Sequence, residues 1–145
     1  MDAKQNVATA RGLIMSNEYK DWLNDNLTAL NAKMWEADFL PDGWTDTFIP
    51  DMKKELANVI GCYVDDFVVF QIKEKYGALR MYWSWADRDY NENEIKDLNE
   101  LTNEIQALVR KYETISEKTC VVCGKEATKM TTGWVMPVCD EHEYI

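Results

Sequence analysis

Apolar side chains recur at helical spacing in three separate segments of this sequence. The first segment starts at Ser16, a residue type that caps helix N-termini, and its pattern predicts a helix to about Met34. The last segment predicts a long amphipathic helix over about 94–117, which leads directly into a cysteine-rich region. Each helix has one apolar face, so both are expected to pack against other elements.

The middle segment has an apolar residue at every fourth position over 48–60 and ends at Gly61. This spacing predicts a second N-terminal helix, with Thr47 as its N-cap. Pro50 is compatible with the assignment, because the first residues of a helix have no intrahelical N–H bond to lose. The preceding residues 40–43, with the sequence Leu-Pro-Asp-Gly, predict a turn.

Two runs rich in β-branched and aromatic residues, 67–74 and 79–85, flank a turn at Gly77 and predict a β-hairpin. If Glu74 pairs with Leu79, one face of the hairpin is mainly apolar and the other is mainly polar. In that register the predicted pairs are Ile72 with Met81, Phe70 with Trp83 and Val68 with Trp85 on the apolar face, and Lys73 with Arg80, Gln71 with Tyr82 and Val69 with Ser84 on the other. A slip of one residue would mix the two faces.

These elements predict an α+β fold in which helices pack on a β-hairpin or small antiparallel sheet. An isolated hairpin is only marginally stable in water, so the helices are expected to cover its apolar face. The chain has 145 residues, 46% of them hydrophobic, which is enough to bury a core. We expect an α+β domain over 1–118, with its hairpin at 67–85, and a C-terminal zinc-ribbon or knuckle-like module over 119–145.

The metal module is predicted from Cys120, Cys123, Cys139 and His142, which form two short-spaced pairs. Thiolate and imidazole ligands at such spacing are typical of Zn²⁺ sites. Four protein ligands fill a tetrahedral coordination sphere and leave no position for a reactive water, so the expected zinc is structural. A short strand over 134–138 is expected to deliver the second pair.

His142 is the only histidine in the chain. If it binds zinc, catalytic schemes that use histidine as a base are excluded. The alternative is that Asp140, Glu141 or Glu143 is the fourth ligand, which would leave His142 free. The sequence also has no Gly-x-Gly-x-x-Gly motif and no phosphate-binding P-loop, so an enzyme here would depend on carboxylates and a second metal such as Mg²⁺.

The chain is acidic, with 16 basic and 26 acidic residues and a formal net charge of −10. This charge repels nucleic-acid phosphates unless the basic groups gather on one face, so nucleic-acid binding is disfavoured. No apolar run is long enough to cross a bilayer or to form a signal-peptide core. Because cysteines in a metal-ligand pattern fit a reducing compartment, we expect a cytoplasmic protein with no membrane partner.

The polar face of the hairpin is the second candidate site. Lys73 and Arg80 are expected to lie opposite each other, and like charges in that position destabilise a sheet unless an anion is close. The anion is either a carboxylate of the chain itself, from Glu74, Asp65 or Asp87, or a carboxylate or phosphate of a partner. Lys75, Tyr76 and Tyr82 would extend this candidate partner-binding surface, since aromatic side chains beside basic ones can stack on bases.

Residues 71–82 read Gln-Ile-Lys-Glu-Lys-Tyr-Gly-Ala-Leu-Arg-Met-Tyr, and a helix, Cys-x-x-Cys-Gly, Gly-Trp and Cys-x-x-His follow in that order. The second half of the chain thereby resembles a family of small, largely uncharacterised phage and prophage proteins. That family carries a Lys-Glu-Lys-Phe-Gly-x-Leu-Arg-Phe-Tyr segment before the same cysteine motifs; Tyr76 and Met81 replace its common phenylalanines. The resemblance implies a phage protein in the bacterial host cytoplasm and supplies no catalytic residues.

Three functions follow from these observations. We favour a non-enzymatic phage accessory protein that binds a host or phage protein and inhibits, for example, a host defence or nucleic-acid enzyme. The acidic surface makes DNA mimicry one way to do so. The alternatives are a nucleic-acid-binding zinc protein that uses the Lys73 and Arg80 face, and a carboxylate- and metal-dependent enzyme.

Overall fold

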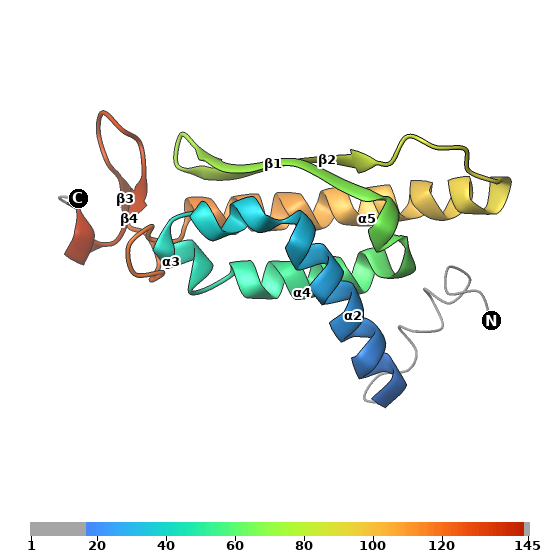
Figure 1. Ribbon diagram of the computed structural model, residues 1–145. Coiled ribbons are helices and arrows are strands. Elements are labelled where there is room, and N and C mark those ends of the chain that lie inside the picture. The colour runs from blue at the N-terminus through green and yellow to red at the C-terminus, as the bar shows by residue number, and fades with distance from the viewer. Residues whose placement is uncertain (1–16, 144–145) are drawn as a thin grey trace.

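A computed structural model describes residues 17–143 of the chain. The predicted cap at Ser16, the start of the first predicted domain and the last two residues of the second lie outside the described residues. The fold is α+β, with a two-stranded antiparallel hairpin along a long helix (Figure 1). In chain order, with η for a 3-10 helix, the elements are α2 (Asn17–Lys33), η2 (Trp35–Phe39), α3 (Asp42–Thr45), α4 (Ile49–Ile60), η3 (Gly61–Asp66), β1 (Phe67–Lys75), β2 (Ala78–Trp85), α5 (Glu92–Glu117), β3 (Lys129–Met130), β4 (Pro137–Val138) and η4 (Asp140–His142).

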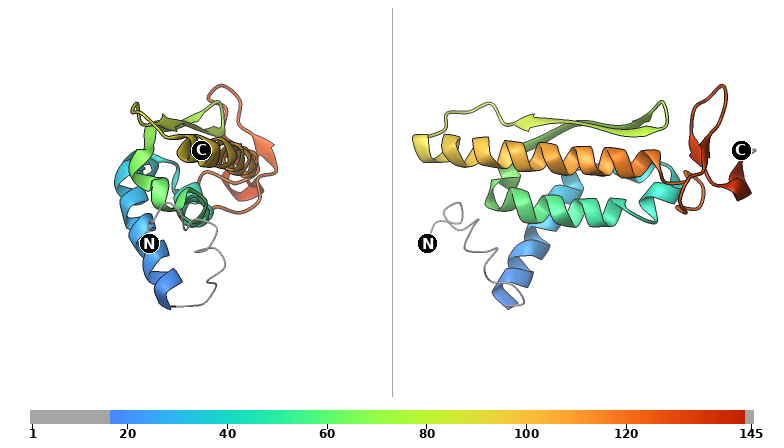
Figure 2. Two further views of the ribbon diagram at one scale, coloured as in Figure 1. Left: turned by 90° about the vertical axis from the view of Figure 1, so that its right-hand side faces the viewer. Right: turned by 180° about the vertical axis from the view of Figure 1, so that it is seen from behind.

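The elements form layers around α5. The hairpin lies on one side of α5, α4 packs on the opposite side, and α2 crosses α4 (Figures 1 and 2). Trp44, Tyr63 and Phe67 are the largest side chains that are fully buried between these layers. The C-terminal module, residues 119–143, lies beside α3 at the end of the molecule where α5 stops (Figure 1).

The predicted helices are present, and α5 begins slightly earlier than expected. Its N-cap is Asn91, whose side chain accepts a hydrogen bond from the Glu94 N–H at 2.8 Å. The Glu94 carboxylate in turn accepts the N–H of Asn91, at 3.1 Å. This reciprocal capping box satisfies two backbone donors that a helix start leaves free, so α5 starts at Glu92 rather than at about residue 94.

The helix α4 ends at Gly61 as predicted, where the backbone has a φ of 57°. The predicted cap is wrong: Phe48 is the N-cap and makes no side-chain hydrogen bond. Thr47 is engaged elsewhere, because its hydroxyl donates to the Gly43 carbonyl at 2.6 Å. The predicted turn at 40–43 is wrong in its second half, since a one-turn helix, α3, starts at Asp42.

The hairpin register is confirmed from the turn to the pair Gln71–Tyr82, which includes the predicted opposition of Lys73 and Arg80. Beyond that pair, the prediction is wrong because a β-bulge falls between Val69 and Gln71. Phe70 has no partner in β2 and is 65% exposed. The predicted pairs Phe70–Trp83, Val68–Trp85 and Val69–Ser84 are replaced by Val69–Trp83, Val68–Ser84 and Phe67–Trp85.

Aromatic packing accounts for this shift. A bulge sets two residues of one strand against one of the other, so the side chains beyond it change face. Phe67 is thereby fully buried, with its ring centroid 5.1 Å from that of Trp83 and 5.8 Å from that of Trp85. The alternation of apolar and polar residues along β1 does not predict this aromatic packing, because the packing involves side chains from both strands.

A carboxylate of the chain does offset one of the two opposed cations, Arg80, but it is none of the three predicted ones. Arg80 forms an ion pair with Glu113 of α5, with 3.2 Å between Nη1 and Oε2. The Lys73 ammonium lies 5.9 Å from the centre of the Tyr82 ring. Glu74 is used locally, because its carboxylate accepts the N–H of Gly77 at 2.7 Å. The prediction missed Glu113 since only tertiary packing brings α5 alongside β2.

We expect Arg80→Glu to destabilise the protein by about 1 kcal/mol, because it replaces a partly buried ion pair with two facing carboxylates. The charge-swapped variant Arg80→Glu with Glu113→Arg should recover most of this loss. Urea unfolding of the two variants and the parent measures both effects. An Arg80→Glu variant at least as stable as the parent would instead mean that repulsion from Lys73 dominates at this position.

Candidate metal centre

The four predicted ligands lie close together, with their ligand atoms within 4.8 Å of one another. His142 Nδ1 is 3.2 Å from the sulfur of Cys139 and 3.7 Å from that of Cys120, and the sulfurs of Cys123 and Cys139 are 3.7 Å apart. With bonds of about 2.3 Å to sulfur and about 2.0 Å to nitrogen, the ligands of a tetrahedral zinc are about 3.5 to 3.8 Å apart. The group can therefore hold a metal ion of this kind.

Two tight turns deliver the ligands. In the first, the Gly124 N–H donates to the Cys120 carbonyl at 3.0 Å, and Gly124 has a φ of 79°, which favours glycine. In the second, the His142 N–H donates to the Cys139 carbonyl at 3.1 Å as the chain enters η4. The strand before it is shorter than predicted, because β4 covers only Pro137–Val138.

The surroundings shift the pKa values of two cluster thiols, Cys120 and Cys139, in opposite directions. Burial raises the pKa of Cys120, but hydrogen bonds from the backbone at Cys123, Cys139 and Val122 outweigh burial and lower this pKa to about 6. Burial raises the pKa of Cys139, and the neighbouring thiols of Cys123 and Cys120 add to the rise. A bound cation would favour the thiolate at every cysteine, since thiolates are the metal-binding form.

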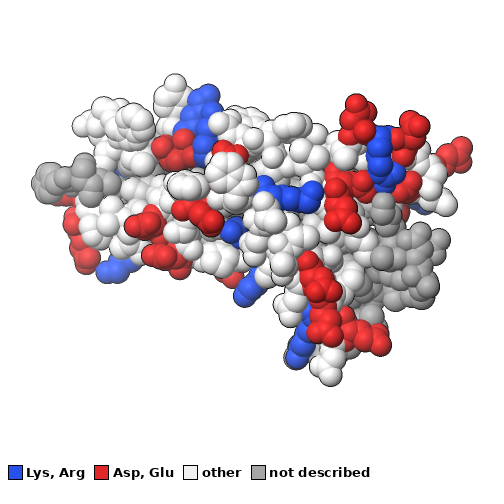
Figure 3. Space-filling view, in the orientation of Figure 1, with Lys and Arg blue, Asp and Glu red and all other residues white. Residues whose placement is uncertain are grey.

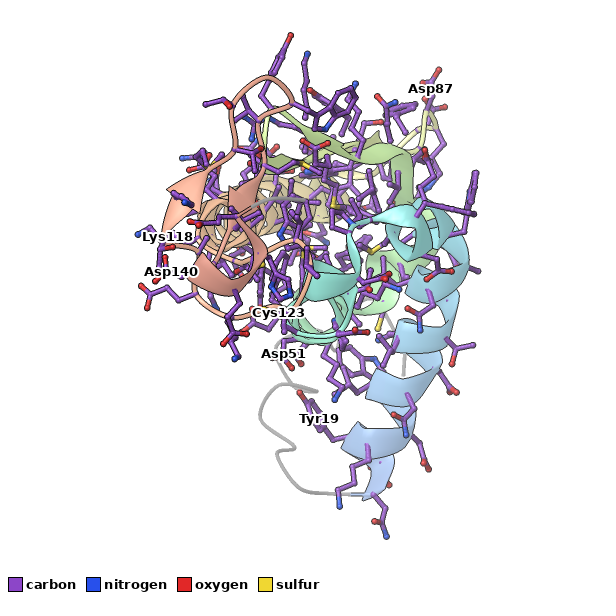
Figure 4. The ribbon with its side chains drawn as sticks, turned by 90° about the vertical axis from the view of Figure 1, so that its left-hand side faces the viewer. Tyr19, Asp51, Asp87, Lys118, Cys123 and Asp140 are labelled. Carbon is purple, nitrogen blue, oxygen red and sulfur yellow. The ribbon has the colours of Figure 1, made fainter. Side chains whose placement is uncertain are left out.

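The three carboxylates that could replace His142 are engaged elsewhere. Asp140 accepts the Thr128 hydroxyl at 2.6 Å. Glu141 and Glu143 form ion pairs with the module's own lysines, Lys125 and Lys129 respectively. In Figure 4, Cys123 lies on the side of the module that faces α3, whereas Asp140 lies on its outer side. The geometry therefore favours the imidazole as fourth ligand.

The metal module packs on α3 through its backbone. The Gly43 N–H donates to the Val121 carbonyl at 2.8 Å, and the indole of Trp44 donates to the Thr119 carbonyl at 3.0 Å. A Cβ atom at Gly43 would overlap the Cys120 carbonyl oxygen and lie 2.8 Å from the Gly124 nitrogen. Sequence reasoning missed this role, because a glycine after Pro-Asp is also what a plain turn requires.

The predicted partner-binding surface is divided by the fold. Lys73, Lys75 and Tyr76 line a pocket of about 290 Å³ between the β1–β2 turn and the β3–β4 loop, opposite Trp134. We call this pocket the hairpin–module groove; Glu74, Gly133 and Val135 complete its lining. Arg80 is paired with Glu113, and Tyr82 lines a separate hollow beside Phe70 and α5.

Trp134 is the functional candidate that the sequence prediction left out of this surface. Its side chain is 77% exposed, as is that of Tyr76 on the facing hairpin turn. The sequence contains one signal for it, since Trp134 directly follows a turn glycine, and turns usually lie at the surface, where tryptophan is uncommon. What the sequence did not indicate was that the β3–β4 loop and the hairpin turn lie next to each other.

No protein-family model matches this chain, and no curated protein or solved structure matches it either. Its function is therefore argued from the site itself. Within residues 17–143, the Cys120 to His142 cluster is the one group of three or more histidine, cysteine, aspartate or glutamate side chains that can hold a metal ion. In the same part of the chain, no helix is long and apolar enough to cross a membrane.

We expect Cys123→Ser to release the metal and to expose the C-terminal module to proteolysis, because binding worth on the order of 10 kcal/mol holds such small modules folded. Metal content by mass spectrometry and the rate of tryptic cleavage at Lys125 and Lys129 measure the two effects. Retained metal with unchanged protection would contradict the ligand assignment.

Two variants serve as matched controls for that experiment. Cys62→Ser makes the same chemical change away from the cluster, at a sulfur that accepts a hydrogen bond from the Trp22 indole. Asp140→Asn removes the charge of one rival ligand. Both should keep the metal content of the parent, and metal loss in Asp140→Asn would return that carboxylate to the ligand set.

We expect Gly43→Ala to destabilise the metal-loaded protein by about 3 kcal/mol or more, because the added methyl group meets backbone atoms that cannot move independently. Gly133→Ala is the comparison, since Gly133 has a φ of 78° but open space around it. That variant should lose only about 1 kcal/mol, from backbone strain alone. Equal losses in chemical unfolding would show that the contact with α3 is not tightly packed.

Proposed function

We propose that this chain is a non-enzymatic phage or prophage protein that binds another protein through the hairpin–module groove. The observation that carries the proposal is the pair of exposed aromatic side chains, Tyr76 and Trp134, that line one pocket from two different elements. Aromatic side chains exposed in a groove are typical anchors of protein interfaces, since they bury a large area with few rotatable bonds.

Zn²⁺ is the metal that the ligand set suits best. Three thiolates and one imidazole are soft and borderline ligands, and their mutual distances fit a tetrahedron. The role we assign to the ion is structural, because four protein ligands leave no open position for a substrate or water. The module between the ligands has strands of only two residues each, β3 and β4, so the ion supplies the stability that a core would supply elsewhere.

The biological setting rests on the motif resemblance. A phage protein made in a bacterial cytoplasm meets host proteins at once, and that compartment keeps cysteines reduced and able to bind zinc. Acidic side chains are spread over α2 and the rest of the face seen in Figure 3, with lysine and arginine side chains between them. The acidic side chains on this face form separate groups with uncharged surface between them (Figure 3), which supports a local groove as the binding site more than a continuous acidic surface that mimics DNA.

Nucleic-acid binding is the second candidate function, and one observation favours it. Lys73 and Lys75 lie beside the two exposed aromatic rings, a combination that can hold a phosphate and stack a base. The net charge of −10 opposes it. The carboxylate enzyme has less support, since the buried carboxylate of Asp66 forms an ion pair with Arg88 at 2.7 Å and no second metal-holding group lies among the described residues.

We expect affinity capture from a bacterial lysate to recover a protein partner with the parent chain and to lose it with Trp134→Ala. Trp35→Ala is the matched control, because Trp35 is also exposed, at 59%, but lies on η2 outside the groove. Mass spectrometry of the captured material identifies the partner. Equal capture by Trp134→Ala would reject the groove as the binding site, and capture of DNA or RNA in its place would favour the second candidate function.

A further inference from the structure

We propose that the hairpin–module groove binds an acidic, extended segment of a partner protein, in which carboxylates at alternate positions contact Lys73 and Lys75 and an adjacent apolar side chain enters between Tyr76 and Trp134. This inference rests on the proposed function, since it names the chemistry of the partner at the same site. It follows from the charge, the spacing and the size of the groove.

The two lysines of the groove carry charge that the protein does not neutralise. Among residues 17–143, neither Lys73 nor Lys75 forms an ion pair with a carboxylate. Each ammonium instead lies over a tyrosine ring, at 5.9 Å from the centre of Tyr82 for Lys73 and at 5.7 Å from that of Tyr76 for Lys75. In a chain with a net charge of −10, two adjacent unpaired cations are a local site for an anion.

The spacing of these cations matches an extended peptide. Lys73 and Lys75 are two residues apart in β1, so their side chains leave the same face of the strand, about 7 Å apart along it. In an extended ligand, side chains at positions i and i+2 share a face at the same spacing. Two carboxylates in that arrangement match the spacing at which the two lysine side chains leave the strand. Rotation of the flexible Lys73 side chain away from the Tyr82 ring brings its ammonium group to the ligand.

The apolar part of the groove takes a side chain rather than a strand of nucleic acid. Its volume of about 290 Å³ suits one or two side chains between the rings of Tyr76 and Trp134. Glu74 also lines the groove, and its carboxylate is held there by the Gly77 N–H at 2.7 Å. This fixed negative charge and the acidic surface beyond repel a continuous phosphate backbone more strongly than a segment with two carboxylates, because every further phosphate adds to the repulsion.

The test uses the full-length, zinc-loaded protein labelled with ¹⁵N and titrated with defined probes. The probes are the blocked peptide Glu-Ser-Glu-Ser-Phe, its counterpart Gln-Ser-Gln-Ser-Phe, and an eight-nucleotide oligo-dT. The readout is the indole N–H signal of Trp134, assigned by its absence from the spectrum of Trp134→Ala. We expect the acidic peptide to shift this signal in a saturable way and the neutral peptide to bind at least about tenfold more weakly.

Charge-reversed variants provide the matched comparison. Lys73→Glu with Lys75→Glu should abolish the shift caused by the acidic peptide. Lys20→Glu with Lys96→Glu gives the same net charge but changes exposed lysines on α2 and α5, outside the groove, and should bind like the parent. Reduced binding in both double variants would overturn the inference, because long-range charge alone would then explain the affinity.

The remaining outcomes separate this inference from the proposed function. Equal binding of the acidic and neutral peptides, or no shift with either, overturns the acidic-segment inference, while capture of a partner that depends on Trp134 would still support a protein-binding groove. Tighter binding of oligo-dT than of the acidic peptide overturns the inference in favour of nucleic acid.

Discussion

Close contact between two backbones holds the C-terminal module of this protein in place. Gly43 in α3 has no side chain, so the turn that carries Cys120 can approach until the Gly43 N–H reaches the Val121 carbonyl at 2.8 Å. The Trp44 indole makes a second hydrogen bond, to the Thr119 carbonyl at the start of the module, and is fully buried. Any side chain at position 43 would push the module away and break both hydrogen bonds.

This contact also positions one wall of the hairpin–module groove. One wall of the groove belongs to the β1–β2 turn, which is held by the packing of the hairpin along α5. The other wall is the β3–β4 loop, which belongs to the module that contains the ligand cluster. The groove exists only while both parts keep their positions, so the ligand cluster, which lies outside the groove lining, still determines whether Trp134 and Tyr76 line one pocket.

The helix α5 links these parts, because it contacts both the hairpin and the module. Glu113 of α5 forms the ion pair with Arg80 of β2. In the last turn of α5, the Ser116 hydroxyl accepts a hydrogen bond from the Leu79 N–H at 2.8 Å. These polar contacts form only when β2 lies at one position along α5, whereas apolar packing is less dependent on exact position. They fix the position of the hairpin turn relative to the end of the helix, where the ligands begin.

The sequence alone determined the predicted helices, the α+β class, the hairpin register near its turn and the four residues of the ligand cluster. The spacing of apolar residues, the turn glycines and the spacing of metal ligands are all properties of residues close together in the chain. Tertiary structure alone decided the β-bulge at Phe70, the pairing of Arg80 with Glu113, the role of Gly43 and the pocket that Tyr76 and Trp134 line together. Each of these depends on atoms from segments far apart in the chain, and their free energy arises only when those segments pack together.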